Sequence, residues 1–278
     1  MIDAYLDESG IHDGAAICVI AGYFGGKGQM RKLERAWKTV LADFDFPMEE
    51  FHAKDLIKSH MHQPMLRGLA RAIAGQEKVC PVSYGIVVED FYSFSLEQRR
   101  FMTGATIDPK TIKLITSGCP TKPYFVPFQN VVRLVTDYAP VGGKAHLNFG
   151  VDRSFAEYAL AMFKQIQEQA KVGPRPWSTW KSVDRLGAAL FPKASETAPL
   201  QAADLLVHLT YRHMCEWHEK EKVAQPSGLL MECLANMRSR DDHKYQDREC
   251  LDQILRQSRG FLGDWDAAYM ASSSPEVL

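Results

Sequence analysis

Two apolar, β-prone segments open the chain and constrain its fold more than any other feature. Residues 2–7 (IDAYLD) and 15–23 (AAICVIAGY) are separated by the turn-rich run ESGIHDG. Strand-forming segments joined by a short turn that contains Gly, Ser and Asp typically make an antiparallel hairpin. We therefore predict that the sheet begins with this hairpin and that its first strand ends at Asp7.

Helical and extended patterns alternate after the hairpin. Residues 29–44 have the apolar spacing of an amphipathic helix, and residues 79–89 predict a central strand rich in valine. The other predicted elements are helices within 51–60, 64–75 and 124–139, a strand over 144–152, a helix over 155–170 capped by Ser154, a strand within 179–191 and a helix over 198–221. This succession predicts an α/β fold: a mixed sheet that starts with the antiparallel hairpin and carries helices on both faces.

The length of the chain is consistent with one large domain over residues 1–278. Of its residues 46% are hydrophobic, which is enough to bury a sizeable core. The Thr, Gly and Pro of residues 103–123 predict an insertion around 90–125. Residues 222–260 predict a helical C-terminal extension.

Composition narrows the classes of protein to be considered. The six cysteines, at 18, 80, 119, 215, 233 and 250, form no CxxC pair, which predicts reduced thiols and a cytoplasmic location. The sequence contains neither a signal peptide nor an apolar run long enough to span a membrane. We therefore predict a soluble protein without membrane partners.

The net charge of −1 lacks the basic excess common among tight nucleic-acid binders, so any such contact needs a local patch. Lys and Arg gather in residues 27–35 and at Lys171, Arg175, Lys181 and Arg185. These groups can bind phosphates, or they can be a solvated helix face and a loop.

Three acidic residues stand where the predicted layout can bring them together. Asp7 closes the first strand, Asp152 closes the strand 144–152, and Asp204 lies early in the helix after the last strand. Three neighbouring carboxylates repel one another unless they share protons or a cation. Because Mg²⁺ and Mn²⁺ prefer oxygen ligands, we predict a site for one of these ions.

Each acid also has a simpler interpretation. Asp7 and Glu8 can bond the backbone of the turn, and Asp152 can stabilise the start of the following helix. Asp204 is harder to explain in this way, because an unpaired carboxylate is costly to bury in the apolar stretch LQAADLLVHL.

Four short segments resemble the domain-of-unknown-function family 3800. They are YLDESG, EEFHAKDL, the strand ending in VDR, and LQAADLL, in the same order over most of residues 2–215. The resemblance implies a ribonuclease H-like fold in which Asp7, Asp152 and Asp204, together with Glu8, bind metal. It implies that Glu50, Gln201 and Ser9 are neighbouring groups that orient these ligands. A fourth acid is left open between Glu50, Glu89 and Asp90.

The histidines allow two further interpretations. His52 in FHAKDL can donate a proton to a leaving oxygen or stand beside the metal, or it can bond backbone at a helix start. His208, His213, Cys215 and His218 suggest zinc, but ligands on one helix face recur every three or four residues. The observed spacings of five and two residues between the first three argue against zinc.

The leading functional hypothesis is a divalent-metal-dependent nuclease that hydrolyses DNA or RNA phosphodiester bonds with two ions. Consistent with chemistry that needs no protein nucleophile, the sequence has no GxSxG elbow, Walker loop or dinucleotide fingerprint. The alternatives are a non-catalytic nucleic-acid or protein binding module on the same scaffold, and a phosphohydrolase of small molecules.

Overall fold

A mixed β-sheet forms the centre of the chain. The computed structural model describes residues 1–12, 14–104, 106–107, 114–115, 120–150, 153–171, 180, 182–192, 197–220, 223–239 and 242–261. Within these residues the main sheet has six strands, ordered β7 (Leu186–Leu190), β6 (Ala145–Gly150), β1 (Ile2–Ser9), β2 (Ile17–Gly26), β3 (Cys80–Val87) and β8 (His243–Gln246). β2 is antiparallel to β1 and β3, and the other neighbouring pairs are parallel. The predicted mixed sheet, its N-terminal hairpin and the interior position of the strand at 79–89 are confirmed.

The hairpin turn depends on a glycine. Gly10 follows β1 with a φ of +74°, and a Cβ at this position would lie 1.9 Å from the carbonyl oxygen of Ile17. Only a residue without a side chain fits this conformation and this close approach. The turn fixes the register in which Asp7 pairs with Ala21 on β2 and with Gly150 on β6.

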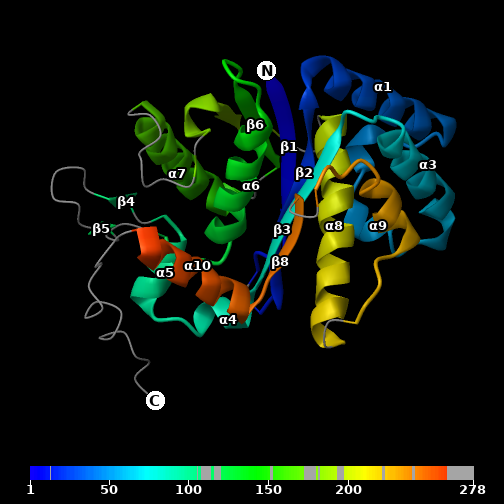
Figure 1. Cartoon of the computed structure of the whole chain (residues 1–278). Helices are drawn as coiled ribbons and strands as arrows, with labels where there is room; N and C mark the ends of the chain where they lie inside the picture. Colours follow the sequence, from blue (N-terminus) through cyan, green and yellow to red (C-terminus); the bar gives the residue numbers. More distant parts are fainter. Residues whose placement is uncertain are drawn as a thin grey trace.

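Helices cover both faces of the sheet, as predicted (Figure 1). One face carries α4 (Val88–Tyr92), α5 (Leu96–Met102), α6 (Phe125–Tyr138), α7 (Arg153–Lys171) and α10 (Arg248–Phe261). The other carries α1 (Lys27–Asp43), α2 (Ala53–Leu56), α3 (Gln63–Ala74), α8 (Ala198–Glu219) and α9 (Gly228–Cys233). Shorter elements are the 3₁₀ turns η1 (Met48–Glu50), η2 (His60–His62) and η3 (Val183–Arg185), and the small hairpin of β4 (Thr106–Ile107) and β5 (Leu114–Ile115).

The side chains on the two faces of β1 belong to different hydrophobic cores. Ile2, Ala4 and Leu6 are buried beneath α6 and α7, whereas Tyr5 packs with the core of α1 and α8. Successive side chains of a strand point to opposite faces. Asp7 therefore lies on the same side as Tyr5, under the long helix α8.

The structure differs from the sequence-based expectations in two places. The helix predicted to be capped by Ser154 already begins at Arg153, so Ser154 lies in its first turn. The segment predicted to be a purely helical extension contains β8, which joins the sheet beside β3. β8 has only four residues, HKYQ, which is too short and too polar for strand periodicity to be recognised.

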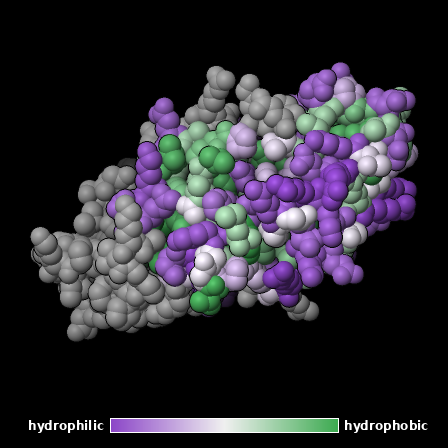
Figure 2. Space-filling view, turned by 90° about the horizontal axis from the view of Figure 1, so that it is seen from above, coloured by the Kyte–Doolittle hydropathy of each residue, from purple (hydrophilic) through white to green (hydrophobic). Residues whose placement is uncertain are grey.

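The surface over α1 is hydrophilic. Seen from above, hydrophilic side chains dominate the side of the molecule that carries α1 and α3 (Figure 2). Arg31, Lys32 and Arg35 of the predicted basic cluster 27–35 are exposed there. Among the described helices, none is long and apolar enough to cross a membrane. The five cysteines in the described ranges are free thiols.

Candidate functional site

Asp7 lies at the end of β1 in confined surroundings. Its Oδ1 accepts the backbone N–H of Glu8 at 2.9 Å. Opposite it on β6, a Cβ added to Gly150 would lie 3.0 Å from the same oxygen, so the glycine leaves room for the carboxylate. The carboxylate is therefore held between two strands and the helix above them.

Asp204 reaches the same region from the second turn of α8, which packs on β1 and β2. Its Oδ2 accepts the backbone N–H of Ala53 at 2.9 Å. Ala53 is the first residue of α2, so Asp204 satisfies one of the free N–H groups at that helix start. The sequence-based expectation that Asp204 has a partner is confirmed.

The two carboxylates are both largely buried, and the charge of Asp204 acts on Asp7. Burial, then the negative charges of Asp204 and Glu8, raise the pKa of Asp7 well above its usual range, although the Glu8 N–H opposes this. Burial also raises the pKa of Asp204, against the effects of the Ala53 N–H and His52. In the described part of the chain, no Lys or Arg forms an ion pair with either acid. The pair is thus poised to take up a proton or a cation.

Glu8 and Ser9, which follow Asp7 on β1, also make contacts away from the pair of Asp7 and Asp204. The strand alternation turns Glu8 toward the opposite face of the sheet. There its charge and a hydrogen bond help burial to raise the pKa of Tyr124, the residue that precedes α6. Ser9 is the last residue of β1 and pairs with Val19.

Gln201 has a structural position one turn before Asp204. Its side chain is only 1% exposed, and its Oε1 accepts the indole N–H of Trp37 at 3.0 Å. Its Nε2 donates to the carbonyl oxygen of Met48 at 2.5 Å. Gln201 therefore ties α8 to α1 and η1, which fixes the part of α8 that carries Asp204.

His52 and Glu50 are both exposed, at the entrance to α2. His52 precedes Ala53 directly, and its positive charge lowers the pKa of Asp204. It is therefore the neighbour in sequence of the residue whose N–H binds Asp204. Glu50 ends η1 on the surface.

The remaining predicted acids do not join the pair within the described structure. Asp152 lies outside the described residues. Asp90 instead accepts the backbone N–H of Arg248 at 2.8 Å, and Glu89 forms an ion pair with His218 at 3.3 Å. Across the described ranges, no group of three or more His, Cys, Asp or Glu side chains is arranged to hold a metal ion.

A basic cleft, which the sequence reasoning missed, begins one helical turn beyond Asp204. It is lined by Lys54, Ile57, Lys58, His208 and Arg212 and has a volume of about 560 Å³. The signal was present in the i, i+4 spacing of positions 204, 208 and 212 on one helix and of 54 and 58 on another. What the sequence did not reveal is that these two segments lie side by side.

The predicted basic clusters lie elsewhere. Residues 27–35 begin α1 directly after Gly26, which pairs with Ile2 at the opposite end of β1 from Asp7. Of the second group, Lys171 ends α7 and Arg185 donates to the carbonyl of Ala139 at 2.7 Å. Arg175 and Lys181 fall outside the described residues.

The histidines suggested for zinc are dispersed along α8. His208 lines the basic cleft, whereas His213 lies close enough to His243 to help lower the pKa of that residue. His218 accepts or donates a hydrogen bond to Tyr245 at 3.2 Å. Each histidine thus serves a different neighbour.

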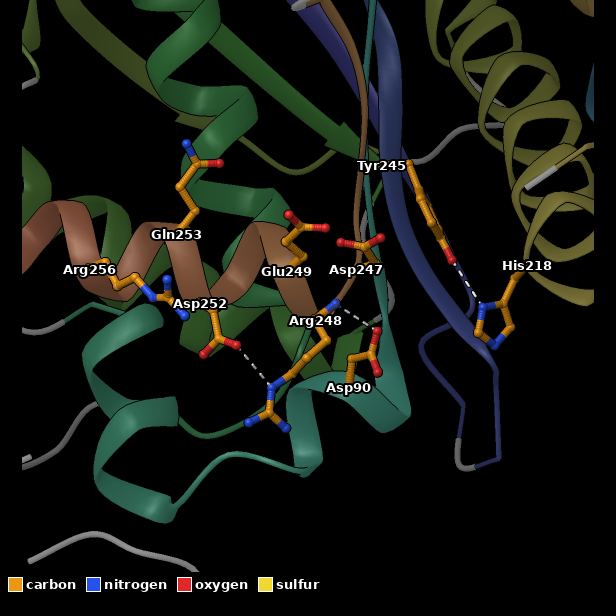
Figure 3. Close-up of a pocket in the computed structure, with 9 residues that line it drawn as sticks. All are labelled: Asp90, His218, Tyr245, Asp247, Arg248, Glu249, Asp252, Gln253 and Arg256. Atoms are coloured by element: carbon orange, nitrogen blue, oxygen red, sulfur yellow. Dashed lines mark hydrogen bonds and ion pairs between the residues drawn. The ribbon is translucent and has the colours of Figure 1, made fainter. Parts of the chain in front are cut away.

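His218 and Tyr245 also line a larger cleft, of about 740 Å³, between the end of α8 and α10 (Figure 3). Contacts within this cleft engage Arg248. Arg248 lies 3.5 Å from Asp252, and its guanidinium lies over the ring of Phe94. We therefore assign the candidate site to the acid pair and the adjoining basic cleft.

Comparison with known protein families, with curated proteins and with solved structures gives no match for this chain.

Proposed function

We propose that this chain is a divalent-metal-dependent nuclease with a ribonuclease H-like fold, which hydrolyses phosphodiester bonds of nucleic acid at Asp7 and Asp204. The observation that supports this most is that burial raises the pKa of both acids and that the charge of Asp204 raises the pKa of Asp7 further. A pair of confined carboxylates without a basic partner is a ligand set suited to Mg²⁺ or Mn²⁺.

The donor set fits such an ion in part. Asp7 and Asp204 supply carboxylate oxygens from a strand end and a helix, and Asp152, two residues after Gly150 in the sequence, is the third acid of the proposal. When bound, a divalent ion would stabilise the negative charge that develops on a phosphodiester during hydrolysis.

The other residues have roles that follow from their contacts. The Ala53 N–H and the packing of α8 hold Asp204 in one orientation. His52, exposed beside Ala53, can give a proton to the leaving oxygen. The fixed carboxylates would hold the divalent ion in place, and its positive charge would stabilise the negative charge that develops on the phosphodiester.

A cleavage assay tests this proposal. Purified protein is incubated with end-labelled single- and double-stranded DNA, RNA and hybrids, in Mg²⁺, Mn²⁺ or EDTA, beside the Asp7→Ala variant. We expect metal-dependent cleavage of at least one polymer, which EDTA and the variant abolish.

Two outcomes would favour the alternatives. Well-folded protein that binds a polymer but cleaves none with either ion would indicate a binding module. Turnover of nucleotides without cleavage of polymers would indicate a hydrolase of small phosphorylated molecules. Metal-dependent activity that survives in Asp7→Ala would place the chemistry elsewhere.

A further inference from the structure

The basic cleft gathers three cations whose charges are not neutralised by ion pairs. Lys54 and Lys58 come from α2 and the residues after it, and Arg212 comes from α8. All three are exposed, and within the described structure none of them forms an ion pair with a carboxylate. A cleft of this kind attracts an anion.

His208 lines the basic cleft together with the three cations. Burial, followed by the positive charges of Arg212, Lys54 and Lys58, lowers the pKa of His208 to about 4. His208 is therefore neutral near pH 7 and can accept or donate a hydrogen bond in the cleft. Only Asp55, also on α2, opposes these charges, and its own charge helps raise the pKa of Asp204.

The cleft has a defined position relative to the acid pair. Asp204, His208 and Arg212 recur every four residues, so they share one face of α8. At 1.5 Å per residue, Arg212 lies about 12 Å along the helix axis from Asp204. A nucleic-acid strand carries one phosphate per about 3.4 Å of helix axis, so this separation corresponds to about three to four nucleotides.

We infer that the basic cleft binds a backbone phosphate of a nucleic-acid strand, with Arg212 about three to four nucleotides from the bond cleaved at Asp204. The inference rests on the proposed function for the position of the cleaved bond. The side chains suit the role, because Lys and Arg contacts to phosphates position a polymer without reading its sequence. Hydrolysis of the bond takes place at the acid pair, and the cleft supplies binding alone.

The first test measures binding without cleavage. In EDTA, the anisotropy of a fluorescein-labelled single-stranded oligonucleotide, longer than the expected footprint, is titrated over about 50 to 200 mM salt. The proteins compared are the wild type, Arg212→Ala, Lys58→Ala and the control Arg71→Ala, which removes an exposed cation from α3.

Loss of one phosphate contact on a single strand makes the negative slope of log K against log salt shallower by about 0.7. This change corresponds to about a fivefold loss of affinity near 0.1 M salt. We expect this change in Arg212→Ala and in Lys58→Ala, but not in Arg71→Ala. Equal slopes in all four proteins, or no binding by the wild type, would overturn the inference.

The second test uses substrate length. In Mg²⁺ or Mn²⁺, Arg212→Ala should raise the KM for the long oligonucleotide and leave cleavage of a dinucleotide unchanged, because a dinucleotide cannot span the distance from Asp204 to Arg212. Loss of activity on both lengths to the same degree would contradict the positioning role. Reduced salt slopes without cleavage by any protein would overturn the proposed nuclease function and leave the cleft as a nucleic-acid binding site.

Discussion

The carboxyl group of Asp7 retains its proton to higher pH than an exposed aspartate, because burial and the charge of Asp204 raise its pKa. Between its ordinary pKa and the raised value, the folded state binds more protons than the unfolded state. The free energy of unfolding therefore falls as pH rises through this window. At pH values above this window, the ionised pair of Asp7 and Asp204 destabilises the metal-free protein.

Asp7→Asn should consequently stabilise the protein in EDTA near neutral pH. Asn retains an oxygen for the Glu8 N–H but removes the charge. We expect a rise in Tm of about 2–4 °C, the size of a change of about 1 kcal/mol in a chain of this length. The rise should vanish below about pH 4, where Asp7 of the wild type is protonated in both states. Calorimetry across this pH range provides the measurement.

The matched control is the Tm of the same two proteins measured with added Mg²⁺ or Mn²⁺. If the pair binds the ion, the wild type should gain Tm with ion concentration through mass action, and Asp7→Asn should gain little. Equal gains in both proteins would show that the ion binds elsewhere.

At the scale of elements, α8 connects the acid pair, the basic cleft and the core. Gln201 holds this helix through the Trp37 indole and the Met48 carbonyl while being almost fully buried. Gln201→Leu would leave both groups without these partners, each at a cost of about 1–3 kcal/mol.

We therefore expect Gln201→Leu to lower Tm by at least about 4 °C. Glu50→Gln, a change at an exposed position of η1, should leave Tm unchanged and serves as the control. A Tm that does not fall in Gln201→Leu would contradict the anchoring role of this side chain.

The elements that sequence could predict are those with a long local pattern. The hairpin of β1 and β2 and the helices α1 and α8 follow from apolar spacing over many residues. β8 was missed because its four residues belong to the sheet only through pairing with β3, more than 150 positions away. Local propensity carries no information about such a partner.

The candidate site likewise has a part that the sequence could predict and a part that it could not. Asp204 could be singled out because a carboxylate in an apolar helix needs a partner, and the structure supplies the backbone N–H of Ala53. The basic cleft could not be predicted, because Lys54 and Arg212 meet only when α2 packs on α8. Asp152 lies outside the described residues, so its role stays a prediction.

At the scale of the whole molecule, two histidines make stability sensitive to acid. The pKa of His208 and that of His243 are lowered to about 4, the second mainly by burial and then by the charge of His213. His243 is also hydrogen-bonded to Ser83, which is fully buried on β3. Between pH 6.5 and about 4 the folded state binds fewer protons than the unfolded state, so stability is lost as pH falls through this window.

His243→Gln should reduce this acid sensitivity. Gln can keep a hydrogen bond to Ser83 but does not titrate, so the drop in Tm from pH 7 to pH 4.5 should be smaller than in the wild type by several degrees. The comparison between the two proteins cancels the opposing contribution of Asp7. Identical pH profiles would show that His243 is not protonated on unfolding.

The measurement that tests the central claim most directly is the single-turnover rate of polynucleotide cleavage in Mg²⁺ or Mn²⁺. The proteins compared are the wild type, Asp7→Asn, Asp204→Asn, their double variant, and Asp43→Asn as a control at an exposed end of α1. Because both acids would hold the ion that stabilises the reacting phosphodiester, each single variant should lose at least about a hundredfold in rate. The double variant should be hardly slower than either, as residues that act as a unit are not additive, and Asp43→Asn should match the wild type. Cleavage at the wild-type rate by the folded double variant would contradict the assignment of the site.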